Sequence, residues 1–251
     1  LIAMPSHSWS PWRPLAGMPA LDAAVLAETL DGGQAFRWHR VADEDAWLGI
    51  WADHVAQLRL DARGSVEWRA PEKMAGRVAA ALPRYFGLDR DFAAHVDALP
   101  WRCDPHLARC VAEFRGLRIL RQPFGETLLG FLCSATKQLV QIKQMVALLA
   151  ARHGTQIAPG HFQLPTWPTL AEVPEAELRR CLLGFRARYI AETAKFLAAH
   201  PGWLEETETL PYAAAKERLC SLPGVGEKVA DCVLLFGAGK LEAFPVDVWI
   251  L

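Results

Sequence analysis

The first hundred residues alternate apolar and polar positions with a period of two, which is typical of antiparallel strands that turn one face toward water. The alternation predicts four strands, over residues 34–38, 46–51, 55–60 and 65–69. Turn residues at 52–53 and 62–64 connect them into a meander, and a helix is expected over 74–86. Residues 1–20, rich in Pro and Trp, are expected to be an irregular lead-in.

From residue 101 onward the apolar positions take the spacing of helices. Between 137 and 153, for example, Leu139, Ile142, Val146 and Leu149 form one apolar stripe. Helices are predicted over residues 105–114, 124–134, 137–153, 175–183, 187–200, 212–220 and 227–236. The change of period near residue 100 predicts an α+β chain, with an antiparallel sheet domain over 1–100 and a mostly helical domain over 101–251.

Composition narrows the class of protein. The chain has 251 residues, of which 52% are hydrophobic, enough for a sizeable core. It has no run of 18 apolar residues and no signal sequence, so we expect no membrane contact and a cytoplasmic location. Six scattered cysteines without a C-x-x-C pair favour reduced thiols and no metal site. Since the chain starts at Leu1 and stops at Leu251 within a predicted helix, we expect both ends to be incomplete.

Charge is unevenly distributed, although the net charge is only −1. Residues 1–100 hold 10 basic and 13 acidic side chains, whereas residues 101–152 hold 8 basic and 3 acidic ones. A local basic excess of this kind suits a nucleic-acid partner, although a solvated helix face would account for it equally well.

The segment over residues 219–249 contains the candidate chemistry. A turn with two glycines, Gly224 and Gly226, separates the helices predicted over 212–220 and 227–236. Glycine lets another backbone approach closely, and the first N–H groups of the second helix have no partner within it. The amides of Gly224, Gly226 and Val229 are therefore expected to bind a phosphate.

Three side chains beside this turn are candidates for catalysis. The positive end of the helix dipole disfavours an ammonium at Lys228, and so favours the neutral amine that a nucleophile requires. Cys232 follows four residues later on the same helix face. Asp247 precedes an apolar run, where it suits a helix N-cap, and its carboxylate could stabilise a developing positive charge on a sugar. Each residue alone also has an ordinary interpretation, as a surface lysine, a core thiol and a helix cap.

The sequence L-P-G-V-G-E-K-V-A-D-C at 222–232, followed by P-V-D-V at 245–248, resembles the helix-hairpin-helix Gly/Pro/Asp superfamily of DNA glycosylases. The V-A-D-C continuation is closer to its 8-oxoguanine branch than to its endonuclease III branch. The resemblance implies that Lys228 is the nucleophile of a bifunctional glycosylase and AP lyase, that Asp247 assists it, and that Cys232 lines the base pocket. It implies no cofactor.

Three further segments resemble the same branch. They are G-Q-A-F-R-W at 33–38, G-L-R-I-L-R-Q at 116–122 and G-F-R-A-R-Y at 184–189. The resemblance implies that the carbonyl of Gly33 accepts a hydrogen bond from N7–H of the oxidised base. It also implies that Arg186 contacts the cytosine left behind, with Phe185 as a wedge beside it. Without the resemblance, Gly33 would be an ordinary turn glycine and Arg186 a phosphate contact or a surface charge.

Two positions depart from that family's pattern. Thr136 stands where an asparagine-rich turn fills the emptied duplex, and Trp249 stands where a histidine touches a phosphate. We expect both to contact DNA, with a changed reading of the opposite base.

The sequence thus predicts a monomeric base-excision repair enzyme that acts on double-stranded DNA containing an oxidised purine. One alternative is a glycosylase for alkylated bases, whose attack by water needs no lysine. A second is a non-catalytic helix-hairpin-helix DNA-binding protein, in which replacing Asp247 would change stability alone. A third is a chain that keeps the motif but lacks activity without a final helix.

Overall fold

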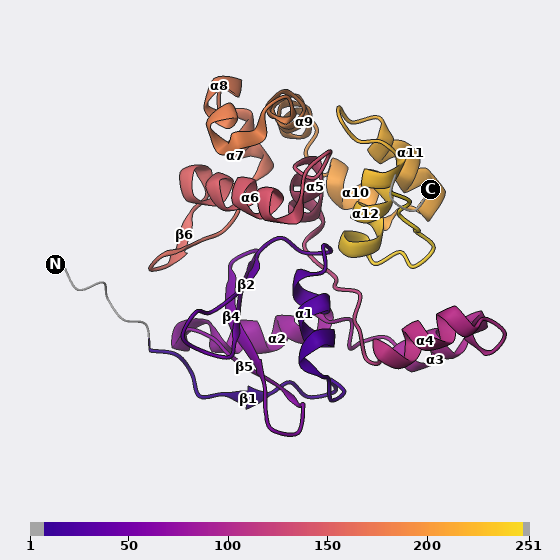
Figure 1. Cartoon of the computed structure of the whole chain (residues 1–251). Helices are drawn as coiled ribbons and strands as arrows, with labels where there is room; N and C mark the ends of the chain where they lie inside the picture. The colour runs from indigo at the N-terminus through magenta and orange to yellow at the C-terminus, as the bar shows by residue number, and fades with distance from the viewer. Residues whose placement is uncertain (1–7, 248–251) are drawn as a thin grey trace.

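The computed structural model describes residues 8–247 (Figure 1). Its N-terminal part is a five-stranded antiparallel sheet with the strand order β1-β5-β4-β3-β2. The strands are β1 (Arg13–Pro14), β2 (Trp38–Arg40), β3 (Trp47–Trp51), β4 (His54–Leu60) and β5 (Val66–Arg69). The predicted meander from β2 to β5 is confirmed by the register, in which Trp47 lies opposite Leu58 and Leu58 opposite Trp68.

The prediction for residues 34–38 is wrong except at Trp38, the first residue of β2. Gly33 has a φ of +103°, and the Gln34 side chain bonds to backbone groups elsewhere, so the chain bends here instead of joining the ladder. The irregular lead-in was also only partly right, because Arg13 and Pro14 pair with β5. Pro14 is tolerated there because β1 is an edge strand.

The two faces of the sheet differ, but neither is fully open to water. One face is rich in tryptophan, and α2 (Ala75–Tyr85) packs on it, with Trp38 Nε1 donating to Tyr85 Oη at 2.8 Å. The other face was expected to be wet, yet Gln57 is only 6% exposed. Arg69 donates to Gln57 at 2.6 Å and stacks on Trp9 and Trp12, so the N-terminal segment covers this face.

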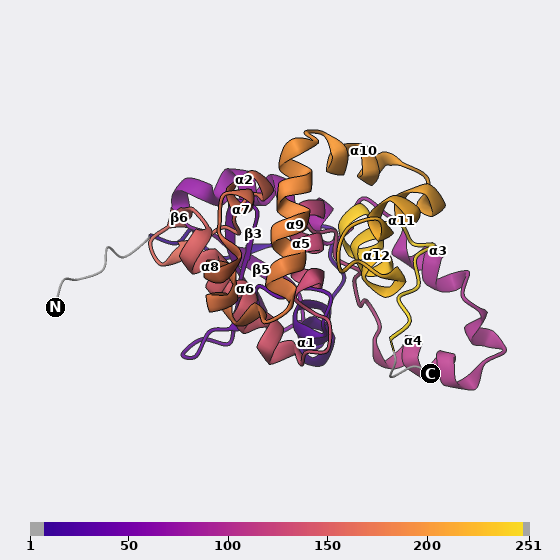
Figure 2. The same ribbon diagram turned by 90° about the horizontal axis from the view of Figure 1, so that it is seen from above.

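The remainder is mostly helical. Its α-helices are α3 (Phe92–Asp97), α4 (Pro105–Glu113), α5 (Phe124–Leu132), α6 (Leu139–His153), α7 (Trp167–Ala171), α8 (Glu175–Leu178), α9 (Arg186–Ala199), α10 (Trp203–Thr209), α11 (Tyr212–Cys220) and α12 (Glu227–Val233). In the sheet part, α1 (Ala23–Asp31) precedes β2. Helices α3 and α4 extend away from the body, and neither contains a buried residue (Figures 1 and 2).

Several short elements were missed or misjudged. Helices α3, α7 and α10 have seven residues or fewer, too few to show a clear period. The hairpin of β6 (Gln156–Ala158) and β7 (His161–Phe162) interrupts the helical part. The helix predicted over 175–183 ends as an α-helix at Leu178, because Leu182 adopts a left-handed conformation.

Helix α5 connects the two parts of the chain. Phe131 on α5 contacts Phe36 from the sheet part at 5.1 Å and Phe236 beyond α12 at 5.7 Å, between ring centroids. A Cβ on Gly130 would lie 2.9 Å from the Phe36 ring, so the glycine allows this contact. The boundary predicted at residue 100 stays a prediction, and Leu120 packs within the core of the sheet part.

Gln34 holds the sheet part against the segment that enters α5. Its Nε2 donates to the carbonyls of Thr29 and Arg118 at 2.8 and 2.9 Å, and its Oε1 accepts from the Leu120 amide at 2.9 Å. Gln122 in turn donates from its side chain to the Gln34 carbonyl. Two of the segments singled out in the sequence, 33–38 and 116–122, are therefore hydrogen-bonded to each other.

We expect Gln34→Ala to lower the free energy of unfolding by about 2–4 kcal/mol, because one amide and two carbonyls lose their partner in a partly buried place. For a chain of this size that corresponds to a fall in Tm of roughly 5–12 °C. Thermal denaturation checks this, with Gln156→Ala on the exposed face of β6 as the control. Equal Tm values for the two variants would contradict the expectation.

Candidate active site and DNA-binding surface

The turn between α11 and α12 is shaped by packing as well as by glycine. Gly224 has a φ of +77°, and a Cβ there would lie 2.5 Å from the ring of Tyr189 on α9. Gly226 is the N-cap of α12, has open space where a Cβ would be, and no side chain caps the helix. Gly224 is thus needed for the fold, whereas Gly226 leaves the start of α12 accessible.

A buried carboxylate fixes the angle between these two helices. Asp231, only 5% exposed, accepts from Tyr212 Oη at 2.7 Å and from Lys216 Nζ at 3.0 Å. Lys216 also pairs with Glu227 at 3.3 Å. The hydrogen bond with Asp231 is the main cause that raises the pKa of Lys216. Sequence reasoning gave neither Lys216 nor Asp231 a role, although Asp231 lies within the segment over residues 219–249 and Lys216 lies in the predicted helix that leads into it.

The structure brings Lys228, Asp247 and Cys232 together. Lys228 Nζ lies 3.2 Å from Asp247 Oδ2, and both side chains are a little over one third exposed. Burial raises the pKa of the Cys232 thiol to about 11, while the charge of Lys228 acts in the opposite direction. The result is an amine in contact with a carboxylate, reachable from solvent, beside a neutral thiol. The helix that Asp247 was expected to cap lies outside the described residues, as does Trp249.

Gly33 is connected to this group through its neighbour Gln34 and through Gln122. Its positive φ and the open space around its Cα leave the backbone accessible. The neighbouring Gln34 bonds to Gln122, and the Gln122 amide donates at 2.7 Å to the carbonyl of Phe236, in the wider helical turn Leu234–Ala238 that continues α12. The role of its carbonyl in base recognition stays a prediction.

Arg186, Thr136 and Phe185 form a second group. Arg186 is 2% exposed, and its guanidinium donates to the carbonyls of Leu183 and Ala135 and, at 2.9 Å, to the Thr136 hydroxyl. In this arrangement it faces the protein and joins two turns. Phe185 is 51% exposed and stacks on Arg186, 4.4 Å from ring centroid to Cζ. Their contacts to DNA stay predictions.

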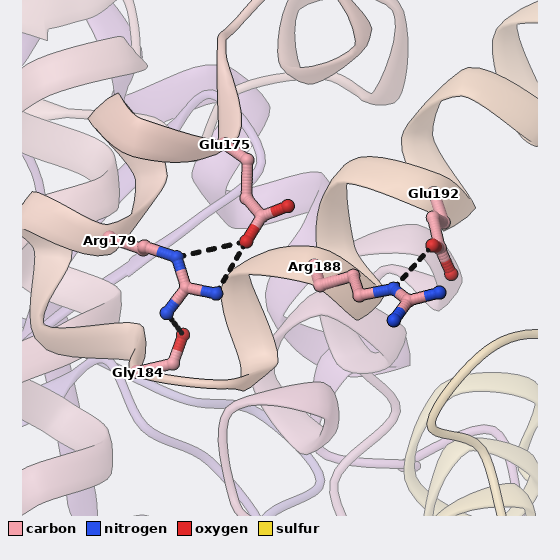
Figure 3. A network of polar contacts seen from close by, with 5 residues as sticks. All are labelled: Glu175, Arg179, Gly184, Arg188 and Glu192. Atoms are coloured by element: carbon pink, nitrogen blue, oxygen red, sulfur yellow. Dashed lines mark hydrogen bonds and ion pairs between the residues drawn. The ribbon is translucent and has the colours of Figure 1, made fainter.

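A further arginine fixes the same turn from outside. Arg179 donates to Glu175 on α8 and, at 3.2 Å, to the Gly184 carbonyl, while Arg188 pairs with Glu192 along α9 (Figure 3). Sequence reasoning missed Arg179, because its effect depends on a kink after α8 that no periodicity revealed.

One large cavity does not contain the predicted site residues. It has a volume of about 940 Å³, and Trp51, Glu126, Arg121 and Trp203 lie in its wall. Within residues 8–247 no three His, Cys, Asp or Glu side chains gather as a metal site would require. Among the helices of that same range, none has the length and apolar character needed to cross a bilayer.

Comparison with known proteins gives consistent results. The family model described as "8-oxoguanine DNA glycosylase, N-terminal domain" matches residues 20–128. N-glycosylase/DNA lyase OGG1 of Arabidopsis thaliana is 38% identical over 90% of this chain and 64% of its own length. The N-glycosylase/DNA lyase of Saccharomyces cerevisiae is 31% identical over 90% of this chain and 66% of its own. The chain thus spans slightly less than two thirds of both curated relatives.

A solved structure extends the similarity to the fold. It is the 8-oxoguanine glycosylase/lyase of Clostridium acetobutylicum, in complex with double-stranded DNA containing cytosine opposite 8-oxoG. It superposes with a TM-score of 0.80 and 32% identity, over 89% of this chain and 76% of that one.

The thiols should differ in reactivity, because the thiolate is the nucleophile and burial holds Cys232 in the neutral form. At pH 7.5 we expect iodoacetamide to modify the exposed Cys103 and Cys110 at least roughly tenfold faster than Cys232. Mass spectrometry of timed digests measures this, and modification of Cys232 should accelerate as the pH rises toward 11. Labelling of Cys232 at the rate of Cys103 would show that its pocket is open and polar.

Proposed function

The chain belongs to the 8-oxoguanine DNA glycosylase family, and from this premise we propose that it excises 8-oxoguanine from duplex DNA and then nicks the strand. The observation that carries the proposal is the contact of 3.2 Å between Lys228 Nζ and Asp247 Oδ2, beside Cys232 on α12. A phosphate-binding lysine would need no carboxylate partner, whereas an amine that attacks a sugar benefits from one nearby.

The reaction begins when the lesion leaves the base stack, because its glycosidic bond cannot be reached inside the duplex. The Nζ lone pair of Lys228 attacks C1′, the bond from C1′ to the base breaks, and the base departs with the bonding electrons. Asp247 stabilises the positive charge that builds on the sugar. A proton then passes from the attacking nitrogen to O4′, so that the sugar ring opens and a protonated Schiff base forms between Lys228 and C1′. Transfer of a C2′ proton to water then expels the 3′ phosphate.

The base and the duplex are recognised by separate residues. The Gly33 carbonyl accepts a hydrogen bond from N7–H, a proton that guanine lacks, and Cys232 supplies an apolar wall. The amides of Gly224, Gly226 and Val229 bind a phosphate of the damaged strand at the start of α12, which no side chain caps and where Gly226 leaves room. Phe185, Thr136 and Arg186 act at the position that the lesion leaves, and the expected contact of Trp249 with DNA concerns a residue outside the described range. The partner is double-stranded DNA, bound by a cytoplasmic monomer.

Lys228 and Asp247 also separate this proposal from its alternatives. An alkylated-base glycosylase that activates water needs the carboxylate but gains nothing from an amine 3.2 Å away. A non-catalytic DNA-binding protein needs neither group. The amine–carboxylate contact therefore favours lysine chemistry over both.

Borohydride trapping tests the proposal. We expect the protein to form a covalent band with a duplex that contains 8-oxoguanine opposite cytosine, because borohydride reduces the Schiff base. Lys228→Gln should abolish the band, and Asp247→Asn should slow its formation by roughly 10²-fold or more. Lys195→Gln, an exposed lysine on α9, is the matched control and should trap like the unmodified chain.

Two results would refute this assignment. Release of a methylated base without any covalent band would favour the alkylated-base alternative. Tight binding of duplex DNA with neither base release nor a band would favour the non-catalytic one.

A further inference from the structure

The turn between α8 and α9 holds a residue in a conformation that side chains rarely adopt. Within residues 8–247, three residues other than glycine have a positive φ, namely Ala52, Thr136 and Leu182. Ala52 occupies the tight turn between β3 and β4. Leu182, with φ +62° and ψ +17°, and Thr136, with φ +55°, occupy the two turns that the Arg186 guanidinium joins. A leucine in this region is strained, since its Cβ crowds the following carbonyl.

The strain persists because the turn is held from two sides. Arg179, which directly follows α8, donates to the Gly184 carbonyl (Figure 3), and Arg186 donates to the Leu183 carbonyl from α9. Arg179 is itself fixed by Glu175 at 2.6 Å. Backbone strain that is maintained by several contacts of this kind is often found at binding and catalytic sites.

Folding gains little from the leucine side chain itself. Its neighbours Cys181 and Leu183 are fully buried, but Leu182 is 53% exposed. Glycine would suit the backbone and asparagine would tolerate it, so packing does not explain an apolar residue here. The turn thus directs the apolar side chain of Leu182 outward, although the backbone of Leu182 is strained.

The occupant that fits this surface is the DNA duplex. Leu182 and Phe185 stand three residues apart in one turn, and each is more than half exposed. The nearby guanidinium groups of Arg179 and Arg188 are already paired with glutamates, so this edge offers apolar contact more than charge. Apolar side chains that enter a base step unstack it and keep the duplex kinked.

We propose that Leu182 is a second wedge that enters the duplex beside Phe185, where the lesion has left the stack. This inference rests on the proposed function, since it requires a flipped nucleotide. Leu182 contributes to specificity and positioning; it does not touch the reacting atoms.

The test compares stability and binding in Leu182→Gly. Because glycine relieves the strain, Tm should stay the same or rise by roughly 1–3 °C. Binding to a duplex with a non-cleavable abasic analogue opposite cytosine should weaken roughly tenfold by fluorescence anisotropy. The dependence of log Kd on log salt concentration should keep its slope, because no ionic contact is lost. Leu182→Asn should behave in the same way.

A fluorescent base reports on the wedge directly. With 2-aminopurine beside the abasic analogue, the unmodified chain should raise the fluorescence at saturation, and Leu182→Gly should lower that rise by at least half. Leu99→Ala, which removes a leucine that is 43% exposed on the distant α3–α4 extension, is the matched control.

Each outcome decides the matter. Unchanged affinity and fluorescence in Leu182→Gly would overturn the proposal, and so would a fall in Tm in both variants, which would make Leu182 a packing residue. A difference in fluorescence without a borohydride band would support Leu182 as a wedge and contradict the proposed lysine chemistry. If the unmodified chain does not bind the abasic duplex, the wedge proposal and the proposed function are both contradicted.

Discussion

The hydrogen bonds around Gln34 are the constraint on which the rest of the structure depends. Two segments that are more than 80 residues apart in sequence meet there, and each satisfies backbone groups of the other. A sheet and a helical body that met only through apolar side chains could slide relative to one another. Directional bonds to the Arg118 carbonyl and the Leu120 amide set a single register, and the aromatic contacts of Phe131 then pack against it. The Gly33 backbone is thereby fixed relative to α12, which carries the candidate nucleophile.

Sequence reasoning succeeded where a pattern repeats locally or where chemistry is concentrated in a short segment. The meander from β2 to β5 followed from alternation, and the helix-hairpin-helix from two glycines with a lysine close behind them. Lys228, Cys232 and Asp247 could be chosen because they lie within 20 residues of one another, and the structure places Lys228 beside Asp247.

What could not be read from the sequence depends on contacts over long separations. Gln34 looked like a strand residue because its neighbours alternate, yet its side chain bonds to residues 84 and 86 positions away. In the sequence, Asp231 is only one position of the V-A-D-C segment. The fold shows that its carboxylate joins α11 to α12 through Tyr212 and Lys216. Arg186 is a similar case. From the sequence, an arginine that joins two turns cannot be distinguished from an arginine that contacts DNA.

Several of the molecule's arginines and lysines stabilise the fold itself. Arg179, Arg186 and Lys216 are committed to carboxylates and carbonyls within the fold, where each fixes the geometry of a turn or a hairpin. Because the net charge of the chain is −1, its overall charge provides little long-range attraction toward DNA. Under the proposed function, affinity for a damaged site therefore depends on helix-terminal amides and on apolar groups such as Phe185 and Leu182 as well as on ion pairs. The apolar contacts require an opened or kinked duplex, and so they would favour the damaged site over intact DNA more than they would strengthen binding to all DNA.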